Sequence, residues 1–339
     1  MRRHLKPISI IVILLLVFVV LASSVRISSP ADADNSVLST QPSTESTQES
    51  TEVTSEPTQP TETTAPTSPP VQLPPSISAP TAFIYDCRID AFLYTTGNVH
   101  DTLYPASVTK LFTAYVALMY LDLTDTATVG SILQTLPSDS SIAYLEPKDR
   151  LSVSDLIMGM LLPSGGDAAR VLAVAAGQRL LGSTDQADTV YYQAFVDEMN
   201  RQAALLGMND SHFANPDGYH DKDHYVSLAD AVQLGKLCLS SPFIMECAST
   251  KVHTAKDLNK GRDISPWVNT NKLLSETRYP EYYCAQAIGL KTGYTAKAGN
   301  CLLSAFQVED GQLIIGIFGA ESRDDSFYDT LRLFRYATK

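Results

Sequence analysis

The sequence has little positive charge and few cysteines, and both shortages narrow the possible functions. It carries 25 basic against 37 acidic side chains in 339 residues, a formal charge of -12. Proteins that bind nucleic acid need clustered Lys and Arg for the phosphates, so this balance argues against that class. The cysteines are scattered without C-x-x-C spacing, which argues against a disulfide scaffold and a structural zinc site. They are Cys87, Cys238, Cys247, Cys284 and Cys301.

Residues 1–26 predict either a membrane anchor or a signal peptide. Arg2, Arg3 and Lys6 precede an apolar run over residues 8–22, and positive charge on that side keeps the N-terminus in the cytoplasm while the rest crosses the membrane. The run is long for a signal-peptide core and short for a spanning helix of about 20 residues. We favour an uncleaved anchor, and in either case we expect the remaining chain outside the cytoplasm.

Residues 27–80 contain no glycine and no basic residue, but ten of the 19 prolines and seven carboxylates. Such a segment, rich in Ser, Thr, Pro and Glu, buries too little apolar surface to offset the entropy of ordering. We therefore expect a disordered linker between the N-terminal segment and a folded domain over residues 81–339. With 44% hydrophobic residues, the chain has enough apolar side chains for a core in that domain.

The domain begins and ends with strand-like patterns around a helical middle, which predicts an α+β fold. A hairpin is expected over 81–94, and strands over 285–294, 298–308 and 312–320. Residues 107–120 and most of 155–240 have helical spacing, and a last helix is expected over 325–336. Ser-x-x-Asp sequences beginning at Ser152 and Ser227 predict helix N-termini, because the serine hydroxyl caps the first turn.

Three short motifs carry the candidate chemistry. In Ser107-Val108-Thr109-Lys110, helical spacing brings the hydroxyl and the amine together, and a desolvated lysine can activate a serine. Lys291-Thr292-Gly293 falls in a predicted strand, where a substrate backbone can lie along the edge. The third is Ser164-Gly165-Gly166-Asp167 in the helical region. Each motif alone is weak evidence for an active site. A Ser-x-x-Lys sequence is expected by chance in a chain of this length, and the other two motifs also suit an ordinary strand end and a helix-to-helix turn.

Taken together, the motifs resemble those of the serine D-alanyl-D-alanine carboxypeptidases, the low-molecular-mass penicillin-binding proteins. The resemblance covers nearly all of residues 81–339. It is carried by YPASVTKLFTAYVAL, LSVSDLIMGMLLPSGGDAARVLA, FVDEMNRQAALLGMNDSHFANPDGY and GLKTGYTAKAGNCLLSA. It implies the fold shared with serine β-lactamases: about five antiparallel strands flanked by helices, with a mostly helical subdomain and the active site in the cleft between them.

The resemblance also implies roles for the motif residues. Ser107 would be the nucleophile and Lys110 its general base, while Ser164 would help relay protons. Lys291 would keep Lys110 neutral and attract the carboxylate of the substrate.

The remaining expectations concern substrate binding on the predicted strand and after it. Thr292 would contact the substrate carboxylate beside Gly293, and Arg323 would be a second contact. The backbone N–H of Tyr294 would join that of Ser107 in an oxyanion hole. The expected substrate is a peptidoglycan stem peptide ending in D-Ala-D-Ala, with penicillins as covalent inhibitors. No metal, cofactor or nucleic acid is implied, and the expected location is the outer side of a bacterial cell membrane, or the cell wall if the N-terminal segment is cleaved.

Gly166 departs from the family pattern, which usually has Asn at this position. Loss of one such positioning group can lower a rate by about 10²–10³. Two alternatives therefore stay open: a β-lactamase, and a non-catalytic wall-binding or penicillin-sensing domain. Glu198 resembles the deacylating glutamate of class A β-lactamases, but its helical pattern favours a surface helix. The loop at residues 220–224 holds possible metal ligands, although a hydrated polar loop fits its spacing better.

Overall fold

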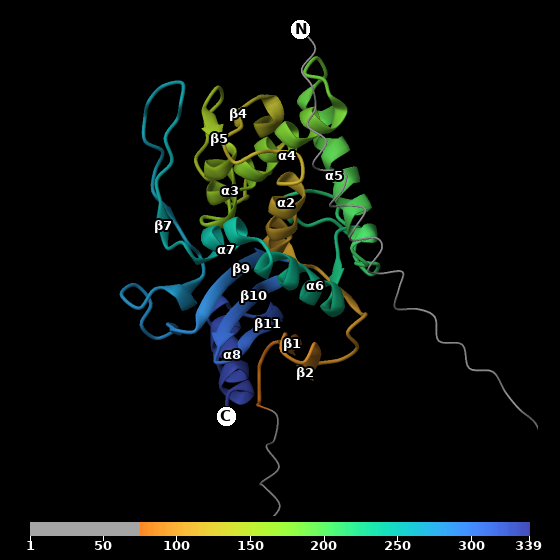
Figure 1. The fold of residues 1–339 in the computed structure, drawn as a ribbon, viewed down its shortest axis with the longest axis vertical. Coiled ribbons are helices and arrows are strands. Elements are labelled where there is room, and N and C mark those ends of the chain that lie inside the picture. Colours follow the sequence, from red (N-terminus) through yellow and green to blue (C-terminus); the bar gives the residue numbers. More distant parts are fainter. Residues whose placement is uncertain (1–74) are drawn as a thin grey trace, which may run out of the picture. The chain divides into compact units, whose positions relative to one another are not determined.

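Five antiparallel strands form the centre of the structure, a computed structural model that describes residues 75–339 (Figure 1). The strands occur in the order β2 (Ala91–Thr95), β1 (Thr81–Asp86), β11 (Gly311–Ala320), β10 (Gly299–Val308) and β9 (Ala287–Thr295). Strand β9, which contains the second motif, therefore lies at an edge of the sheet. The predicted α+β fold and its five-stranded antiparallel sheet are confirmed.

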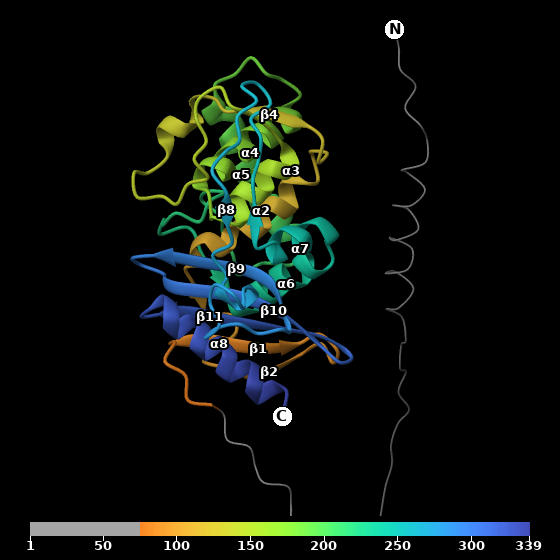
Figure 2. The ribbon, with the colours of Figure 1, turned by 90° about the vertical axis from the view of Figure 1, so that its left-hand side faces the viewer.

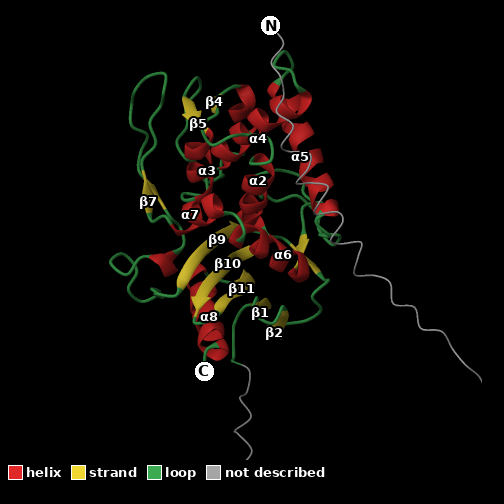
Figure 3. Cartoon of the chain, in the orientation of Figure 1, coloured by secondary structure: helices red, strands yellow, loops and turns green. Residues whose placement is uncertain are grey.

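The sheet has a hydrophobic core on each face, because successive side chains of a strand point to opposite sides. On β1, Phe83 and Tyr85 belong to one core, whereas Ala82 and Ile84 belong to the other. The second core is closed by α8 (Arg323–Ala337), where Phe334 stacks on Phe306 at 4.4 Å between ring centroids. Both faces of the sheet are thus covered, as Figure 3 shows by the helices on either side of the strands.

A helical region lies on the face of the sheet opposite α8 (Figure 2). α6 and α7 contact the strands, whereas α3, α4 and α5 lie farther away and pack with α2. The helices are α2 (Thr109–Ala117), α3 (Val153–Leu161), α4 (Gly166–Leu181), α5 (Asp188–Leu205), α6 (Leu228–Leu239) and α7 (Pro242–Ser249), with 3-10 turns η1 (Ala106–Val108), η2 (Ser131–Thr135) and η3 (Lys272–Leu274). Three short antiparallel pairs complete the fold: β3 (Thr102–Leu103) with β6 (Val226–Ser227), β4 (Thr126–Thr128) with β5 (Arg150–Ser152), and β7 (Val252–His253) with β8 (Trp267–Val268).

Serine hydroxyls cap three helices. The Ser152 and Ser227 side chains each accept a hydrogen bond at 3.1 Å from the backbone N–H three residues later, so both predicted N-termini are confirmed. Ser322 caps α8 in the same way at 3.0 Å. Each hydroxyl satisfies a backbone donor that the first turn of a helix leaves without a partner.

The N-terminal boundary of the fold differs from the prediction. Ser78 and Ala79, assigned by composition to the linker, donate backbone hydrogen bonds at 2.8 and 2.9 Å to the buried carboxylate of Asp329 on α8. Residues 77–80 therefore belong to the folded part. The predicted anchor or signal peptide and most of the linker lie outside the described residues. Within residues 75–339, no helix has the length and apolar character needed to cross a membrane.

Candidate active site

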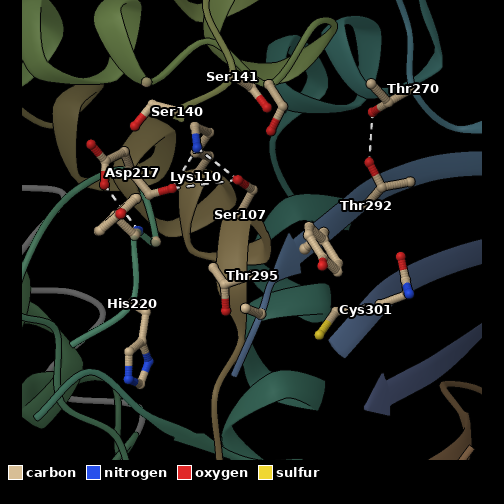
Figure 4. A pocket seen from close by; sticks show the side chains of 18 of the residues that line it. Ser107, Lys110, Ser140, Ser141, Asp217, His220, Thr270, Thr292, Thr295 and Cys301 are labelled. Atoms are coloured by element: carbon tan, nitrogen blue, oxygen red, sulfur yellow. Dashed lines mark hydrogen bonds between the residues drawn. The ribbon is translucent and has the colours of Figure 1, made fainter. Parts of the chain in front are cut away.

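Ser107 and Lys110 meet at the start of α2, beside the cleft drawn in Figure 4. The Lys110 Nζ donates a hydrogen bond of 2.8 Å to the Ser107 Oγ. The preceding residue, Ala106, has a φ of +49°, a conformation that costs a residue with a side chain about 1–3 kcal/mol. The turn and the helix after it therefore place the hydroxyl and the amine together, as the three-residue spacing predicted.

Lys110 is buried without an ion-pair partner among residues 75–339. Its exposed fraction is 2%, and its Nζ also donates to the backbone carbonyl of Asp217. Burial lowers the pKa of Lys110 to about 8, against the opposing effect of the Asp217 and Asp167 carboxylates, while Arg170 lowers it further. Near pH 8 half of the amine is thus neutral and able to accept a proton from Ser107.

A chain of hydrogen bonds supports the Ser107 turn from inside the protein. The backbone N–H of Ala214 donates to His224 Nδ1 at 3.1 Å, so the His224 Nε2 carries the hydrogen and donates to Thr109 Oγ1 at 2.7 Å. The Thr109 hydroxyl donates to the Ala106 carbonyl at 2.8 Å. Burial lowers the pKa of His224 to about 4, which keeps the imidazole neutral. The prediction of a hydrated loop is therefore wrong for His224, which is 2% exposed.

Gly293 lets the edge strand β9 approach the Ser107 turn. A Cβ at residue 293 would lie 2.9 Å from the Ser107 backbone nitrogen and 3.0 Å from the Pro105 carbonyl oxygen. The first distance is shorter than real Cβ contacts and the second is tighter than most of them, so a side chain there would push the strand away. The sequence suggested that this glycine leaves room for a substrate, whereas the structure shows that it first leaves room for the turn.

Lys291 lies behind the wall of the cleft. It is 1% exposed, its Nζ donates to the Thr292 carbonyl at 2.9 Å, and it is not among the described residues that line the cleft. Burial lowers the pKa of Lys291 well below its ordinary value, and the charges of Lys110 and Arg323 lower it further. The amines of residues 110 and 291 therefore repel each other when both are protonated.

The cleft has a volume of about 460 Å³ and is lined by seven of the eight predicted site residues: Ser107, Lys110, Ser164, Thr292, Gly293, Tyr294 and Arg323. Two further residues that line the cleft were missed. Thr270 Oγ1 lies 2.6 Å from Thr292 Oγ1, with either hydroxyl as donor, and Lys297 lines the same cleft as Arg323. No local pattern identifies Thr270, because it lies in a loop 22 residues before its partner.

Ser164 lines the cleft between α3 and α4. Its φ is +68° and its exposed fraction is 6%. In the part of the chain that the structure describes, its hydroxyl makes no hydrogen bond to Ser107 or Lys110. Gly166, the first residue of α4, donates its backbone N–H to the Ser141 carbonyl at 2.8 Å. The third motif thus reaches the cleft without direct bonds to the serine–lysine pair.

Glu198 lies on α5, as its helical pattern predicted, but its side chain points into the protein. Its exposed fraction is 5%, and its carboxylate accepts hydrogen bonds from Arg201 at 2.6 Å, Gln202 at 2.7 Å and the Tyr120 hydroxyl. It is not among the described residues that line the cleft. Within residues 75–339, no group of three His, Cys, Asp or Glu side chains is arranged to hold a metal ion.

The antiparallel sheet, the helical region and the serine–lysine pair between them define an active-serine penicillin-binding fold. More particularly, the chain belongs to the D-alanyl-D-alanine carboxypeptidase family, whose model matches residues 65–322. The predicted family and fold are both confirmed.

Individual relatives show how far the similarity extends. The D-alanyl-D-alanine carboxypeptidase DacF of Bacillus subtilis is 28% identical over 244 residues, which cover 71% of this chain and 57% of that relative. The Streptomyces K15 DD-transpeptidase structure has a TM-score of 0.70 and 26% identity, covering 79% of this chain and 99% of that one. Penicillin-binding protein D2 of Listeria monocytogenes, in its cefotaxime-bound form, has a TM-score of 0.63 and 28% identity over 79% of this chain and all of that one.

Proposed function

We propose that this protein is a serine D-Ala-D-Ala carboxypeptidase that acts on peptidoglycan stem peptides. The Ser107 Oγ attacks the carbonyl carbon of the penultimate D-alanine, and neutral Lys110 accepts the hydroxyl proton. The C–N bond then breaks, the leaving D-alanine takes a proton, and the peptide stays on Ser107 as an ester. Water hydrolyses the ester and restores the serine. The observation that carries this proposal is the 2.8 Å hydrogen bond between a buried, unpaired lysine amine and a serine hydroxyl at the cleft.

The other cleft residues bind the substrate in this mechanism. The terminal carboxylate lies beside Thr292. One hydroxyl of the Thr270–Thr292 pair donates to the other, whose own hydrogen is free to bind the carboxylate, and the cations of Lys297 and Arg323 in the same cleft attract it. The geometry favours an oxyanion hole made by the backbone N–H groups of Ser107 and Tyr294, because β9 contacts the turn that carries Ser107.

Two residues act without contacting the reacting bond directly. Ser164 relays a proton through the substrate or a water, since it lines the cleft but does not bond to the serine–lysine pair. Lys291 assists Lys110 from behind the cleft wall, where charge repulsion disfavours the state in which both amines carry a proton.

The full-length protein should form a covalent adduct with penicillin and release D-alanine from a peptide ending in D-Ala-D-Ala. Mass spectrometry detects the adduct, and its mass should map to Ser107. The Ser107→Ala variant should lose both activities. A variant that is labelled as well as the parent would show that Ser107 is not the nucleophile.

The β-lactamase alternative is not favoured, because Glu198 is held by Arg201, Gln202 and Tyr120 and does not line the cleft. Rapid release of hydrolysed penicillin, instead of a lasting adduct, would support it. The absence of a side chain at Gly166 favours a third possibility, a penicillin-sensing domain that is acylated but does not release D-alanine. The D-alanine assay separates this possibility from the carboxypeptidase.

The proposal includes attachment to the outer side of a bacterial cell membrane through residues 1–26. The support is the charge and apolar pattern of that segment. Cell fractionation and N-terminal sequencing test the attachment. A mature chain in the medium that begins at Ser23 or Val25 would contradict it and indicate a cleaved signal peptide.

A further inference from the structure

Asp217 contacts the serine–lysine pair from the side of the cleft away from Thr292 (Figure 4). Its backbone carbonyl accepts the second hydrogen bond of Lys110 Nζ and lies 3.5 Å from the Ser107 Oγ. Its side chain is a carboxylate only 3% exposed. One residue thus supplies the carbonyl that holds the lysine amine and places a negative charge beside it.

The Asp217 carboxylate is fixed by a buried arginine. Arg170 Nε donates to Asp217 Oδ2 at 2.7 Å, and the Tyr219 backbone N–H donates to Oδ1 at 3.0 Å. Arg170 is 7% exposed, and its Nη1 is held by the Thr135 carbonyl at 3.1 Å and hydroxyl at 2.7 Å. The Asp217–Arg170 pair thus connects α4, the end of η2 and the turn at residues 215–218.

The Asp217 carboxylate lies beside the space that Gly166 leaves open. A Cβ at residue 166 would lie 3.6 Å from Asp217 Oδ2 and 3.1 Å from Leu136 Cδ1. Arg170 follows Gly166 by one turn of α4 and lies on the same helix face. Helix α4 therefore begins without a side chain and, one turn later, supplies the guanidinium that holds the Asp217 carboxylate.

We propose that Asp217, held by Arg170, is the positioning residue that keeps Lys110 against Ser107 in this chain. This inference rests on the proposed acyl-transfer function of the serine–lysine pair. Asp217 does not contact the scissile bond in this role: its carbonyl orients the amine, and its carboxylate sets the electric field in which the amine loses its proton.

Charged groups surround Lys110 on several elements and act in opposite directions. The carboxylates of Asp217 and Asp167 raise the pKa of Lys110, whereas Arg170 lowers it. Lys291, on β9, is close enough for its charge and that of Lys110 to repel each other when both amines are protonated. Removing the negative charge at residue 217 should lower the pKa of Lys110, and removing the positive charge at residue 170 should raise it.

The experiment measures the acylation rate of the full-length protein by a fluorescent penicillin between pH 5 and pH 10. Asp217→Asn should move the acid limb of the profile to lower pH by about one unit and reduce the plateau rate about 10–100-fold. Arg170→Gln should move the limb to higher pH, and Arg170→Lys should leave it close to that of the parent. Limbs that do not move, or that move in the same direction in the Asn and Gln variants, would overturn the inference.

A matched control separates positioning from stability. Asp149 is also a fully buried aspartate held by cations, but it does not line the cleft. Asp149→Asn should lower the melting temperature without moving the pH limb. If Asp149→Asn shifts the acid limb of the pH profile as Asp217→Asn does, the shift reflects a general loss of stability and not the charge at residue 217. The inference then fails.

The failure of the inference can be distinguished from the failure of the proposed function. If penicillin does not acylate the parent at Ser107, the proposed function is wrong. The Lys110 amine can then still be titrated by NMR in protein labelled with ¹³Cε-lysine. Opposite shifts in Asp217→Asn and Arg170→Gln would support the coupling to residue 110, and unchanged titration would overturn it.

Discussion

The protein has two clusters of buried charge that differ in how the charge is compensated. At the cleft, Lys110 and Lys291 are 2% and 1% exposed, and neither forms an ion pair with a described residue. Where the middle of the β7–β8 loop lies beside β5, the Asp149 carboxylate is 0% exposed and forms ion pairs with Lys260 at 2.8 Å and Arg262 at 2.5 Å. The first cluster buries two cations that have no ion-pair partner among the described residues. The second buries one anion that forms ion pairs with two cations.

The difference indicates what each cluster does. Desolvation of an unpaired lysine favours its neutral form, so the cleft obtains a base at the expense of stability. The Asp149 carboxylate bonds to two cations of the β7–β8 loop, and these bonds hold the loop in place. Burial of charge alone therefore does not identify a functional site. Here the candidate base is a buried lysine that has no ion-pair partner among the described residues and donates to a serine hydroxyl at the cleft.

The largest expected effect comes from removing the base at the cleft. Lys110→Met should slow acylation of Ser107 by penicillin at least about 10³-fold, because the hydroxyl loses its proton acceptor. Stopped-flow or gel-based labelling measures this rate. A loss smaller than tenfold would show that another group removes the proton.

Removing the paired aspartate should have the next largest effect, and on a different quantity. Asp149→Asn leaves Lys260 and Arg262 near an uncharged amide. Because water can solvate these two partly exposed cations, the loss should be about 2–3 kcal/mol of unfolding free energy, the magnitude of lost hydrogen bonds to a charged group. Denaturant unfolding measures the loss. The D-alanine release rate of the folded variant should stay within about twofold of the parent. An unchanged unfolding free energy would remove the contrast between the two clusters.

The smallest expected effect is a gain in the free energy of unfolding when Lys110 is replaced by Met. Folding lowers the pKa of Lys110 from 10.5 to about 8, so between these values the unfolded chain binds a proton that the folded one has released. The stability of the parent therefore rises with pH across this window, and below it the full desolvation cost remains. Lys110→Met should be more stable than the parent by about 1–2 kcal/mol at pH 7. Thermal unfolding should show this gain narrow towards pH 10, and a variant less stable than its parent at pH 7 would contradict the account.

Much of the fold could be predicted from the sequence, because local sequence patterns and the family resemblance agreed. The apolar periodicity predicted the strands β9, β10 and β11 within about two residues, and the Ser-x-x-Asp patterns located the starts of α3 and α6. The linker boundary was misplaced, because residues 77–80 have the composition of a linker but bond to Asp329, which is 250 residues away.

The site could be predicted only in part, because contacts between residues far apart in the chain leave no local sequence pattern. The spacing of Ser107 and Lys110 within one helical turn is local, so the sequence predicted their contact. Thr270 and Asp217 join the site through loops distant in sequence, and the key atom of Asp217 is a backbone carbonyl that no residue type reveals. The burial of His224 likewise depends on the tertiary packing around the Ser107 turn.

The most direct test of the account is the titration of the Lys110 amine in the folded protein. Protein labelled with ¹³Cε-lysine, with Lys110→Met used to assign the signal, gives its midpoint by NMR. The account predicts a midpoint near 8, matched by the acid limb of Ser107 acylation. A midpoint near 10.5, the ordinary value for lysine, would show that the cleft does not supply a neutral base and would contradict the mechanism.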